Sequence, residues 1–336
     1  MNLLPDDEQN EIIAQSAAFL ASEMPVARLR ELIEAGEAVD DSVWRASAEL
    51  GWLALGLPES EGGIGATLGD EMLLFRELGR GLTPGPYLAT SLAARVAGAG
   101  GDPELAGSLI GGDCRVGLVV PGQGCRLEAD RLRGPLRVMD AAGAELALVV
   151  NREAAALVRI GELGKTVAET CIDEATPLLA AAEVDAPLAV RLESREIWTR
   201  GIVLSAAMLV GIAEACRDIG AEHARSRVQF DRPIGVNQAI KHPCADMAIR
   251  AEAALCQTVM AAVLVDEGRA DAELQAHSAR VVAADAAERN AAATVQILGG
   301  MGFTFEHDAH LYVKRVQVLA RMLSGTKGLL RAILEA

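Results

Sequence analysis

The sequence predicts a mainly α-helical protein with a small central β-domain, and three observations support this prediction. Apolar residues recur at helical spacing over most of the chain, alanine is abundant, and only 3% of the residues are aromatic. Short apolar runs separated by Gly, Asp and Asn replace this pattern between about residues 113 and 185. We therefore expect an N-terminal helical domain over residues 1–112, a β-domain over 113–188 and a C-terminal helical bundle over 189–336.

Helical periodicity in the N-terminal segment is broken by one glycine-rich stretch. Residues 50–65 contain a proline and several glycines, so we expect a loop there and then a helix over 70–79. Pro84 and Pro86 introduce a further helix that is expected to continue through Ala97.

Short apolar runs predict the strands of the β-domain, and long periodic segments predict the bundle. The expected strands cover residues 116–120, 144–150, 155–160 and 166–172. The expected bundle helices cover residues 192–227, 236–267, 270–298, 307–319 and 326–334. Long antiparallel helices with short connections are typical of a helical bundle.

Charge and composition exclude several classes of function. A net charge of −16 over 336 residues argues against nucleic acid and anionic membranes as partners. The longest apolar run, Ile202–Ile212, is shorter than the roughly 20 residues that span a bilayer, so we expect a buried helix. The first residues lack the basic and apolar regions of a secretion signal. Six cysteines without a Cys-x-x-Cys pair are expected to be reduced, mostly buried thiols of a cytoplasmic protein.

Two motifs, each at the end of a long apolar helix, carry the functional prediction. The first is Arg225-Ser-Arg-Val-Gln-Phe-Asp-Arg-Pro-Ile-Gly-Val-Asn-Gln238, and the second is Gln296-Ile-Leu-Gly-Gly-Met-Gly-Phe303. Together they resemble the acyl-CoA dehydrogenase family, whose pattern is Arg-x-Gln-Phe-Gly-x-Pro-Ile, then Gln, then Gln-x-x-Gly-Gly-x-Gly. The resemblance extends over nearly the whole chain and implies the same three-part fold.

The resemblance implies that these motifs hold the nucleotide tail of an FAD whose flavin ring rests in a neighbouring subunit. The implied cofactor contacts are Arg227, Gln229, Phe230, Gln238, Gln296, Gly299 and Gly300. Arg227 matches the arginine that faces the pyrophosphate, and a guanidinium suits phosphate because its donors bind oxygens in pairs. Asp231 departs from the family glycine, which either restricts the turn or places a negative charge near the phosphates.

The residues that perform the family's chemistry are missing. The family desaturates an acyl-CoA, and a glutamate removes the α-proton while a hydride passes to the flavin. At the two positions where members carry this glutamate, this chain has Ser324 and Gly201, so no catalytic residue is expected. The tract that should contact the flavin ring, Val119–Cys125, contains neither Glu-Pro nor Ser, and no tryptophan lies near residues 138–142.

The chain retains the motifs implied for the FAD tail but lacks the catalytic glutamate and the residues implied for the flavin ring. Together these features indicate a non-catalytic subunit of a heteromeric acyl-CoA dehydrogenase. This pattern resembles the α2β2 enzymes of actinobacteria, several of which act on steroid side-chain CoA thioesters. The resemblance implies FAD shared with a catalytic partner subunit, and electron-transfer flavoprotein as the family's usual electron acceptor. Two alternatives stay open: a self-sufficient homo-oligomeric enzyme with a relocated base, and a flavin-free scaffold that binds acyl-CoA or a protein.

Other polar residues are expected to have structural roles. His307 and His310 lie three residues apart, but no third ligand is indicated, so we expect no metal site. Glu193, Glu196 and Glu214 are candidates for a relocated base, and we expect them instead to be solvated or ion-paired.

Overall fold

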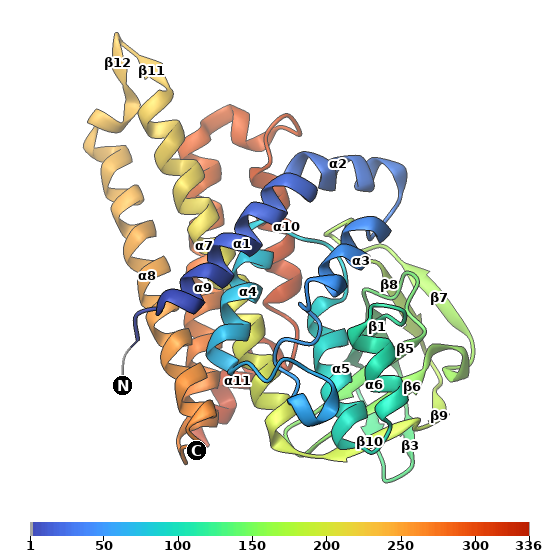
Figure 1. Cartoon of the computed structure of the whole chain (residues 1–336). Helices are drawn as coiled ribbons and strands as arrows, with labels where there is room; N and C mark the ends of the chain where they lie inside the picture. The colour runs from blue at the N-terminus through green and yellow to red at the C-terminus, as the bar shows by residue number, and fades with distance from the viewer. Residues whose placement is uncertain (1–2, 336) are drawn as a thin grey trace. The chain divides into compact units, whose positions relative to one another are not determined.

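The structure is a computed structural model that describes residues 3–335, and its chain forms two compact units (Figure 1). The bundle unit contains the residues up to Val26, Met72–Thr83 and those from Ile202 onward. The sheet unit contains Ala27–Glu71 and Pro84–Gly201. The three segments expected from the sequence stay a prediction, whereas the expected fold class, mainly helical with a central β-sheet, is confirmed.

The sheet unit is built on a seven-stranded sheet with the strand order β10-β6-β5-β1-β4-β8-β7. Neighbouring strands are antiparallel except for β1 and β5, and β2, β3 and β9 form a separate small sheet. The strands are β1 (Val116–Pro121), β2 (Arg126–Leu127), β3 (Arg131–Arg133), β4 (Leu136–Met139), β5 (Leu146–Val150), β6 (Ala154–Arg159), β7 (Thr166–Glu169), β8 (Leu178–Ala181), β9 (Asp185–Pro187) and β10 (Val190–Glu193).

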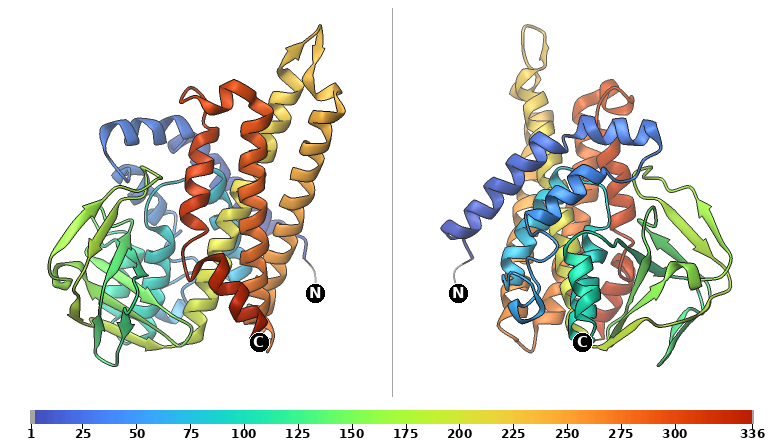
Figure 2. Two further views of the ribbon diagram at one scale, coloured as in Figure 1. Left: turned by 180° about the vertical axis from the view of Figure 1, so that it is seen from behind. Right: turned by 45° about the vertical axis from the view of Figure 1, so that its right-hand side comes forward.

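Helix α5 (Tyr87–Ala99) packs against the sheet within this unit, and α6 (Pro103–Ile110) packs against α5 (Figure 2). The other helices are α2 (Val26–Ala35) and α3 (Asp41–Glu49), with the 3₁₀ turns η1 (Glu59–Glu61) and η2 (Ile160–Glu162). Nearly every residue of α5 is buried, because α5 contacts β1, β5, β6 and β10. Buried Val, Leu and Ala side chains of the strands form the core between the sheets.

The bundle unit consists mainly of long helices, with α8 and α9 packed along each other (Figure 1). Its helices are α1 (Asp7–Glu23), most of α4 (Leu68–Arg80), most of α7 (Arg195–Ser226), α8 (Gln238–Asp266), α9 (Ala272–Leu298), α10 (Ala309–Leu319) and α11 (Gly325–Leu334). Between them lie β11 (Val228–Gln229), β12 (Arg232–Pro233), η3 (Ile234–Val236) and η4 (Gly299–Phe303). The apolar run Ile202–Ile212 is buried throughout, as expected.

Glycine allows two helices of the bundle unit to approach closely. A Cβ atom at Gly211 of α7 would lie 1.9 Å from the carbonyl oxygen of Arg76, and one at Gly79 of α4 would lie 2.0 Å from that of Met208. Any larger residue at either position would force the helices apart. The pair is also joined by an ion pair in which Arg76 Nε lies 2.6 Å from Glu214 Oε2.

Buried polar side chains of α9 set the register of the other bundle helices. Asn290 Nδ2 donates to the carbonyl oxygens of Ala213 on α7 (2.9 Å) and Met247 on α8 (3.0 Å). One turn later Thr294 Oγ1 donates to Cys216 O on α7 (2.8 Å). Since residue numbers increase together on α7 and α9 in these contacts, the two helices run parallel.

Arg280 is a fully buried guanidinium without an ion-pair partner among residues 3–335. Its Nε donates to Ser205 Oγ (2.9 Å) and its Nη2 donates to Leu319 O at the end of α10, whereas Nη1 is buried without a partner. Burial lowers the pKa of Arg280 to about 10. This charge is a net electrostatic cost to the folded unit.

Two expectations from the sequence are wrong. The sequence predicts that the first bundle helix begins at Leu192, but Leu192 pairs with Ala155 as part of β10, so α7 begins at Arg195. The cysteines are all free, as expected, but only Cys114 and Cys216 are buried, and Cys256 is exposed. Both outcomes depend on contacts with residues far away in the sequence, namely the pairing of β10 with β6 and the burial of each cysteine. Local composition does not reveal such contacts.

One helix in the described part of the chain, α8, is long and apolar enough to cross a membrane by length and composition. The sequence analysis considered only the longest unbroken apolar run, Ile202–Ile212, and did not identify α8, because scattered polar residues interrupt the apolar residues of α8. Only 33% of its most apolar window is buried within the chain. A core helix of a bundle passes the same test.

Asp40 provides the first stability prediction. Its carboxylate caps α3 by accepting from the backbone N–H groups of Ser42 and Val43, and it pairs with Arg28 at 2.7 Å. We expect Asp40→Ala to lower the free energy of unfolding by about 1–2 kcal/mol, and Asp40→Asn, which retains the cap acceptor, to lower it less. Urea unfolding followed by tryptophan fluorescence would measure this, because all three tryptophans belong to the sheet unit.

The stability difference between the unaltered chain and its Asp40→Asn variant has a predicted pH dependence. The hydroxyl of Ser42, with Arg28 and the backbone donors, lowers the pKa of Asp40 to about 2 from its ordinary value of 3.8. The advantage of the carboxylate over the amide should therefore be complete above about pH 4 and disappear as the pH falls toward 2. A difference that is independent of pH in this range would show that the charge of Asp40 contributes nothing.

Arg280 provides the second stability prediction. Replacing it by Met leaves Leu319 O bonded to Met322 N and Ser205 Oγ bonded to Ile202 O. We therefore expect Arg280→Met to leave the free energy of unfolding unchanged or to raise it by up to about 2 kcal/mol. As a contrast, Asn290→Ala removes three hydrogen bonds and buried volume and should cost about 2 kcal/mol or more. Urea unfolding followed by far-UV circular dichroism would decide the order of these variants.

Candidate functional site

The two sequence motifs meet at one end of the bundle unit. Because α7 and α9 run parallel, their last turns lie at the same end, where Ile297 Cδ1 lies 3.3 Å from the Cβ position of Gly220. Helix α8 is antiparallel to them and begins at this end with Gln238. In Figures 1 and 2 the β11–β12 hairpin extends from the ends of α7 and α8. We call this region the bundle end.

The first motif forms a two-residue β-hairpin with a strained tip. Val228 pairs with Pro233 and Gln229 with Arg232, which leaves Phe230 and Asp231 as the turn. Both have positive φ, 52° and 61°, as a type I′ turn requires. Asp tolerates this region, but Phe rarely adopts it, and such strain concentrates at functional sites. Asp231 in place of the family glycine therefore does not prevent the turn.

All seven residues expected to contact the cofactor are exposed at the bundle end. The side chain of Phe230 is 93% exposed, and Gln229 Nε2 donates to the neighbouring Val228 O (3.0 Å). Arg227 makes no ion pair with any carboxylate in residues 3–335. Its guanidinium is therefore available to an external anion, which is the arrangement that phosphate binding needs.

The glycines of the second motif have three different roles. Gly299 ends α9 with φ 63° and ψ −137°, a conformation that favours glycine. Gly302 packs against α9, since its Cβ would lie 2.8 Å from Val295 O. Gly300 has neither constraint, because its φ is not in the left-handed region and nothing lies within 4 Å of its Cβ position. The absence of a side chain at Gly300 therefore exposes the backbone there and has no other effect within the described chain.

The first motif is basic although the chain is acidic. Residues 222–242 contain four basic and two acidic residues, a net charge of +2, whereas the whole chain carries −16. Glu222 pairs with Arg225 at 3.0 Å. Glu306 and Asp308, which follow the second motif, offset this charge, so the positive excess is confined to the hairpin segment, where it favours an anionic ligand.

Neither position of the family base holds an acid, and the structure gives each a different environment. Ser324 is exposed and lies in a turn in which Leu323, Ser324 and Gly325 all have positive φ, from 49° to 71°. Gly201 is buried within α7. The hydroxyl of Ser324 has no activating base in contact among the described residues, so it cannot take an α-proton at neutral pH.

The three glutamates considered as substitutes are ion-paired, as expected. Glu193 pairs with Arg191 (2.5 Å), Glu196 with Arg95 (2.9 Å) and Glu214 with Arg76 (2.6 Å). Sequence reasoning missed Glu77, a buried carboxylate of α4 in the bundle unit. Arg76 Nη1 lies 3.9 Å from it, and burial raises the pKa of Glu77 above its usual range.

The tract Val119–Cys125, which the family resemblance places near a flavin ring, forms the end of β1 and the turn that follows it. Residues 122–125 connect β1 to β2, and a Cβ at Gly122 would lie 2.7 Å from Pro135 O. Gly134, with φ 96°, packs equally closely on Gly124 O. The sequence contains no Phe, Trp or Tyr between residues 88 and 197, so the sheet offers no aromatic side chain to a flavin. These residues do not fit the ring half of FAD, whereas those at the bundle end fit a nucleotide tail.

His307 and His310 stabilise the start of α10. The backbone N–H of Ala309 donates to His307 Nδ1 (3.1 Å), and α10 begins at Ala309 rather than at His307 as expected. His310 Nδ1 is 2.8 Å from His307 O. Within residues 3–335 no group of three His, Cys, Asp or Glu residues is arranged to hold a metal.

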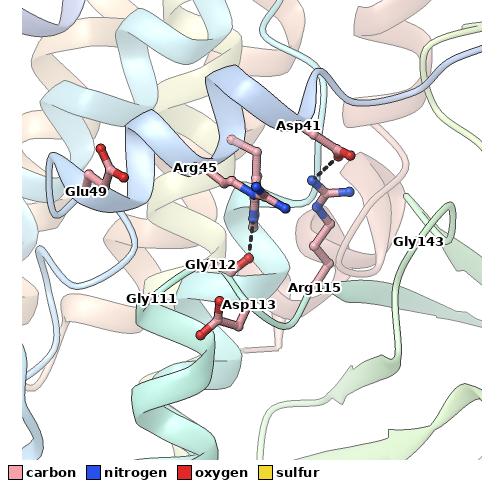
Figure 3. Close-up of a pocket in the computed structure, with 9 residues that line it drawn as sticks. Asp41, Arg45, Glu49, Gly111, Gly112, Asp113, Arg115 and Gly143 are labelled. Atoms are coloured by element: carbon pink, nitrogen blue, oxygen red, sulfur yellow. Dashed lines mark hydrogen bonds and ion pairs between the residues drawn. The ribbon is translucent and has the colours of Figure 1, made fainter.

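The sheet unit contains a separate polar pocket of about 450 Å³, which the sequence did not indicate (Figure 3). Arg115 pairs with Asp41 (2.6 Å) and stacks over the indole of Trp44 (5.1 Å), whose Nε1 donates to Gly112 O (2.9 Å). The arginine is thus neutralised within the pocket wall. The pocket has no part in the motifs described above.

Family comparisons match both helical regions of the chain. The profile described as "Acyl-CoA dehydrogenase, N-terminal domain" matches residues 6–107. The profile described as "Acyl-CoA dehydrogenase, C-terminal domain" matches residues 199–336. The second match contains both sequence motifs and Ser324.

Known proteins resemble the chain over nearly its full length. The acyl-CoA dehydrogenase IpdE2 of Mycobacterium tuberculosis is 33% identical over 98% of each chain. A crystal structure of the ChsE4–ChsE5 complex from M. tuberculosis has a TM-score of 0.88 at 26% identity, covering 100% of this chain and 98% of that one. The Tcur3481–Tcur3483 steroid acyl-CoA dehydrogenase has a TM-score of 0.86 at 23% identity and covers 98% and 97%, which shows a shared fold.

The different roles of the glycines give a prediction for the isolated chain. Gly299→Ala should lower the free energy of unfolding by about 1 kcal/mol or more, because Ala is strained at this φ and ψ. Gly300→Ala should change it by less than about 0.5 kcal/mol, because the added methyl group meets open space. Urea unfolding of the two variants would measure both changes. If Gly300→Ala lowered the free energy of unfolding as much as Gly299→Ala does, Gly300 would have a structural role.

Proposed function

Because the chain belongs to the acyl-CoA dehydrogenase family, whose members bind FAD, we propose that it is a subunit of a heteromeric acyl-CoA dehydrogenase. In this proposal the chain completes the FAD site of a catalytic partner subunit and has no active site of its own. The complex oxidises the Cα–Cβ bond of an acyl-CoA thioester.

One asymmetry carries this proposal. The bundle end presents Arg227, which has no ion-pair partner among residues 3–335, a bare backbone at Gly300 and a basic first motif, all suited to a nucleotide tail. In the same chain, both positions of the catalytic glutamate hold Ser324 and Gly201, and the sheet has no aromatic side chain for a flavin ring. A protein that had lost its function would be expected to lose both sets of residues. This chain keeps the residues suited to the nucleotide tail and lacks those suited to the flavin ring and to proton removal.

The comparisons support a two-component enzyme. The ChsE4–ChsE5 structure, 26% identical to this chain, is itself a complex of two differently named proteins. We propose an α2β2 assembly on this basis, with electron-transfer flavoprotein as the electron acceptor and a cytoplasmic location. We also propose a steroid side-chain CoA thioester as the substrate class. The Tcur3481–Tcur3483 structure, which shares the fold of this chain, is described as a steroid acyl-CoA dehydrogenase.

The residues of this chain would act by binding and orientation. When bound, FAD supplies the acceptor for the hydride that leaves the substrate. Arg227 would bind the pyrophosphate through paired donors, and Gln229, Gln238 and Gln296 would supply neutral hydrogen-bonding groups beside it. Gly299 and Gly300 would let the adenosine approach the backbone, and Phe230 would pack against the cofactor and exclude water. The proton is removed by a residue of the partner.

A second candidate function is a self-sufficient enzyme with a relocated base. Glu77 favours it, because this carboxylate is buried and has a raised pKa, as a general base for a weakly acidic α-proton requires. This alternative predicts that the chain purified alone contains flavin and has activity that Glu77→Gln abolishes.

Co-purification distinguishes the two candidates. We expect the chain alone to be colourless and inactive, and the chain co-expressed with a catalytic acyl-CoA dehydrogenase subunit, sought among the products of neighbouring genes, to form a yellow, active complex. Arg227→Ala should weaken FAD binding by the complex about tenfold to a hundredfold, because charge-assisted hydrogen bonds are lost. Arg227→Lys should recover only part of this loss, since an ammonium group cannot bind phosphate through a planar pair of donors.

The matched control is Arg331→Ala, which removes an exposed arginine of α11 outside the motifs and should leave FAD binding unchanged. Flavin absorbance after gel filtration and fluorescence titration with FAD would provide the measurements. A yellow, active preparation of the chain alone would contradict the proposal. Unaltered FAD affinity in the Arg227→Ala complex would contradict the role assigned to the bundle end.

A further inference from the structure

Two arginines of the sheet unit, Arg95 on α5 and Arg200 on α7, retain unused hydrogen-bond donors. Arg200 and Glu71 are both buried and form an ion pair at 3.2 Å, and Arg95 donates through Nη2 to Gly56 O. The Nε atoms of both arginines are buried without a hydrogen-bond partner among residues 3–335. The same is true of Ser91 Oγ, one turn before Arg95 on α5. Because buried donors are normally satisfied, this cluster indicates an acceptor that the chain itself does not supply.

A single carboxylate joins the two arginines on their exposed side. Glu196 Oε1 lies 2.9 Å from Arg95 Nη1 and 3.8 Å from Arg200 Nη1, so both guanidinium groups converge on one oxygen atom. The side chain of Glu196 is 52% exposed, whereas those of Arg95 and Arg200 are 15% and 5% exposed. Glu196 is therefore the member of the cluster that can rotate into solvent while the arginines stay in place.

The start of α7 adds to the positive potential at this cluster. Glu196 is the second residue of this 32-residue helix, and its backbone N–H donates to Ser194 Oγ (3.1 Å). The N-terminus of a helix carries a partial positive charge that favours anions. Burial and the neighbouring Arg200 lower the pKa of Arg95, although three nearby glutamates oppose the shift. The positive charge of the two arginines is thus incompletely compensated by the chain.

The geometry of the cluster suits a compact carboxylate. Glu196 already places such a group against both arginines. A guanidinium group presents its donors in a planar fork that matches the two oxygen atoms of a carboxylate. The surroundings leave little room, since a Cβ atom at Gly56 would lie 2.4 Å from Glu71 Oε2. A small ligand is favoured for this reason.

We infer that Arg95 and Arg200 form a binding site for a small carboxylate ligand, which takes the place of the Glu196 side chain. One carboxylate replaces another, so the net charge beside the arginines does not change in this exchange. The second oxygen atom of the ligand accepts from an Nε donor that Glu196 leaves unused. The site shares no residue with the two sequence motifs and does not depend on a flavin.

Acetate is the probe for this site, and unfolding of the sheet unit is the readout. Urea unfolding followed by tryptophan fluorescence would be measured at neutral pH and increasing sodium acetate, with sodium chloride keeping the ionic strength constant. A ligand that binds only the folded chain raises the free energy of unfolding by an amount that gives its dissociation constant. Glu196→Gln removes the competing carboxylate. Glu193→Gln is the matched control, because Glu193 is also exposed and pairs with an arginine outside the cluster, Arg191.

We expect Glu196→Gln to bind acetate about tenfold more tightly than the unaltered chain or Glu193→Gln, because the internal carboxylate no longer competes. Arg95→Lys in the Glu196→Gln chain should remove most of this gain, since an ammonium group lacks the planar fork. Equal acetate affinities of Glu196→Gln and Glu193→Gln would overturn the inference, and so would a gain that Arg95→Lys leaves intact.

A second comparison covers the case in which Glu196→Gln does not fold. Arg95→Lys in the otherwise unaltered chain should then reduce the weaker stabilisation that high acetate concentrations give. Stabilisation by acetate that this substitution leaves unchanged, or its absence from the unaltered chain, would also overturn the inference. Chloride is present throughout, so the measured effect reports a preference for the carboxylate over a spherical anion.

Discussion

The structure depends on the hydrogen bonds that Asn290 and Thr294 make from the middle of the bundle. In a bundle built largely from alanine, apolar packing leaves helices free to slide, because small side chains interlock weakly. Asn290 bonds to the backbone of both α7 and α8, and Thr294 bonds to α7 one turn further on. These bonds fix a parallel register between α7 and α9. The two motifs, some 60 residues apart in the sequence, are brought to one end as a result.

The same unit tolerates features that cost stability. Arg280 is buried with an unpartnered donor, and Phe230 and Asp231 adopt backbone conformations that disfavour their side chains. Arg280 joins α7, α9 and the end of α10. Within residues 3–335 the side chains of the hairpin tip make no comparable hydrogen bond. Strain at an exposed tip is consistent with selection for what binds there rather than for the fold.

In the proposed function, the chain separates two tasks that most flavoenzymes combine in one site. Holding a nucleotide requires exposed donors and bare backbone, and residues of both kinds lie on the surface of the bundle end. Removing a proton and accepting a hydride require a carboxylate and an enclosed ring, and the residues suited to these are absent from the sequence positions that the family uses. Since the two tasks depend on different residues, one can be lost while the other is kept. A division of labour between subunits is the functional interpretation of this pattern.

The sequence by itself determined the fold class, most of the helices, the order of the two motifs and the lack of a glutamate at either base position. These are properties of local periodicity and residue identity. Only the tertiary structure decided that β10 takes the residues expected to start α7, that Gly300 lacks an internal role, and that Glu77 and Arg280 are buried. The physical reason is that burial and register arise from contacts between distant segments, which short-range patterns do not specify.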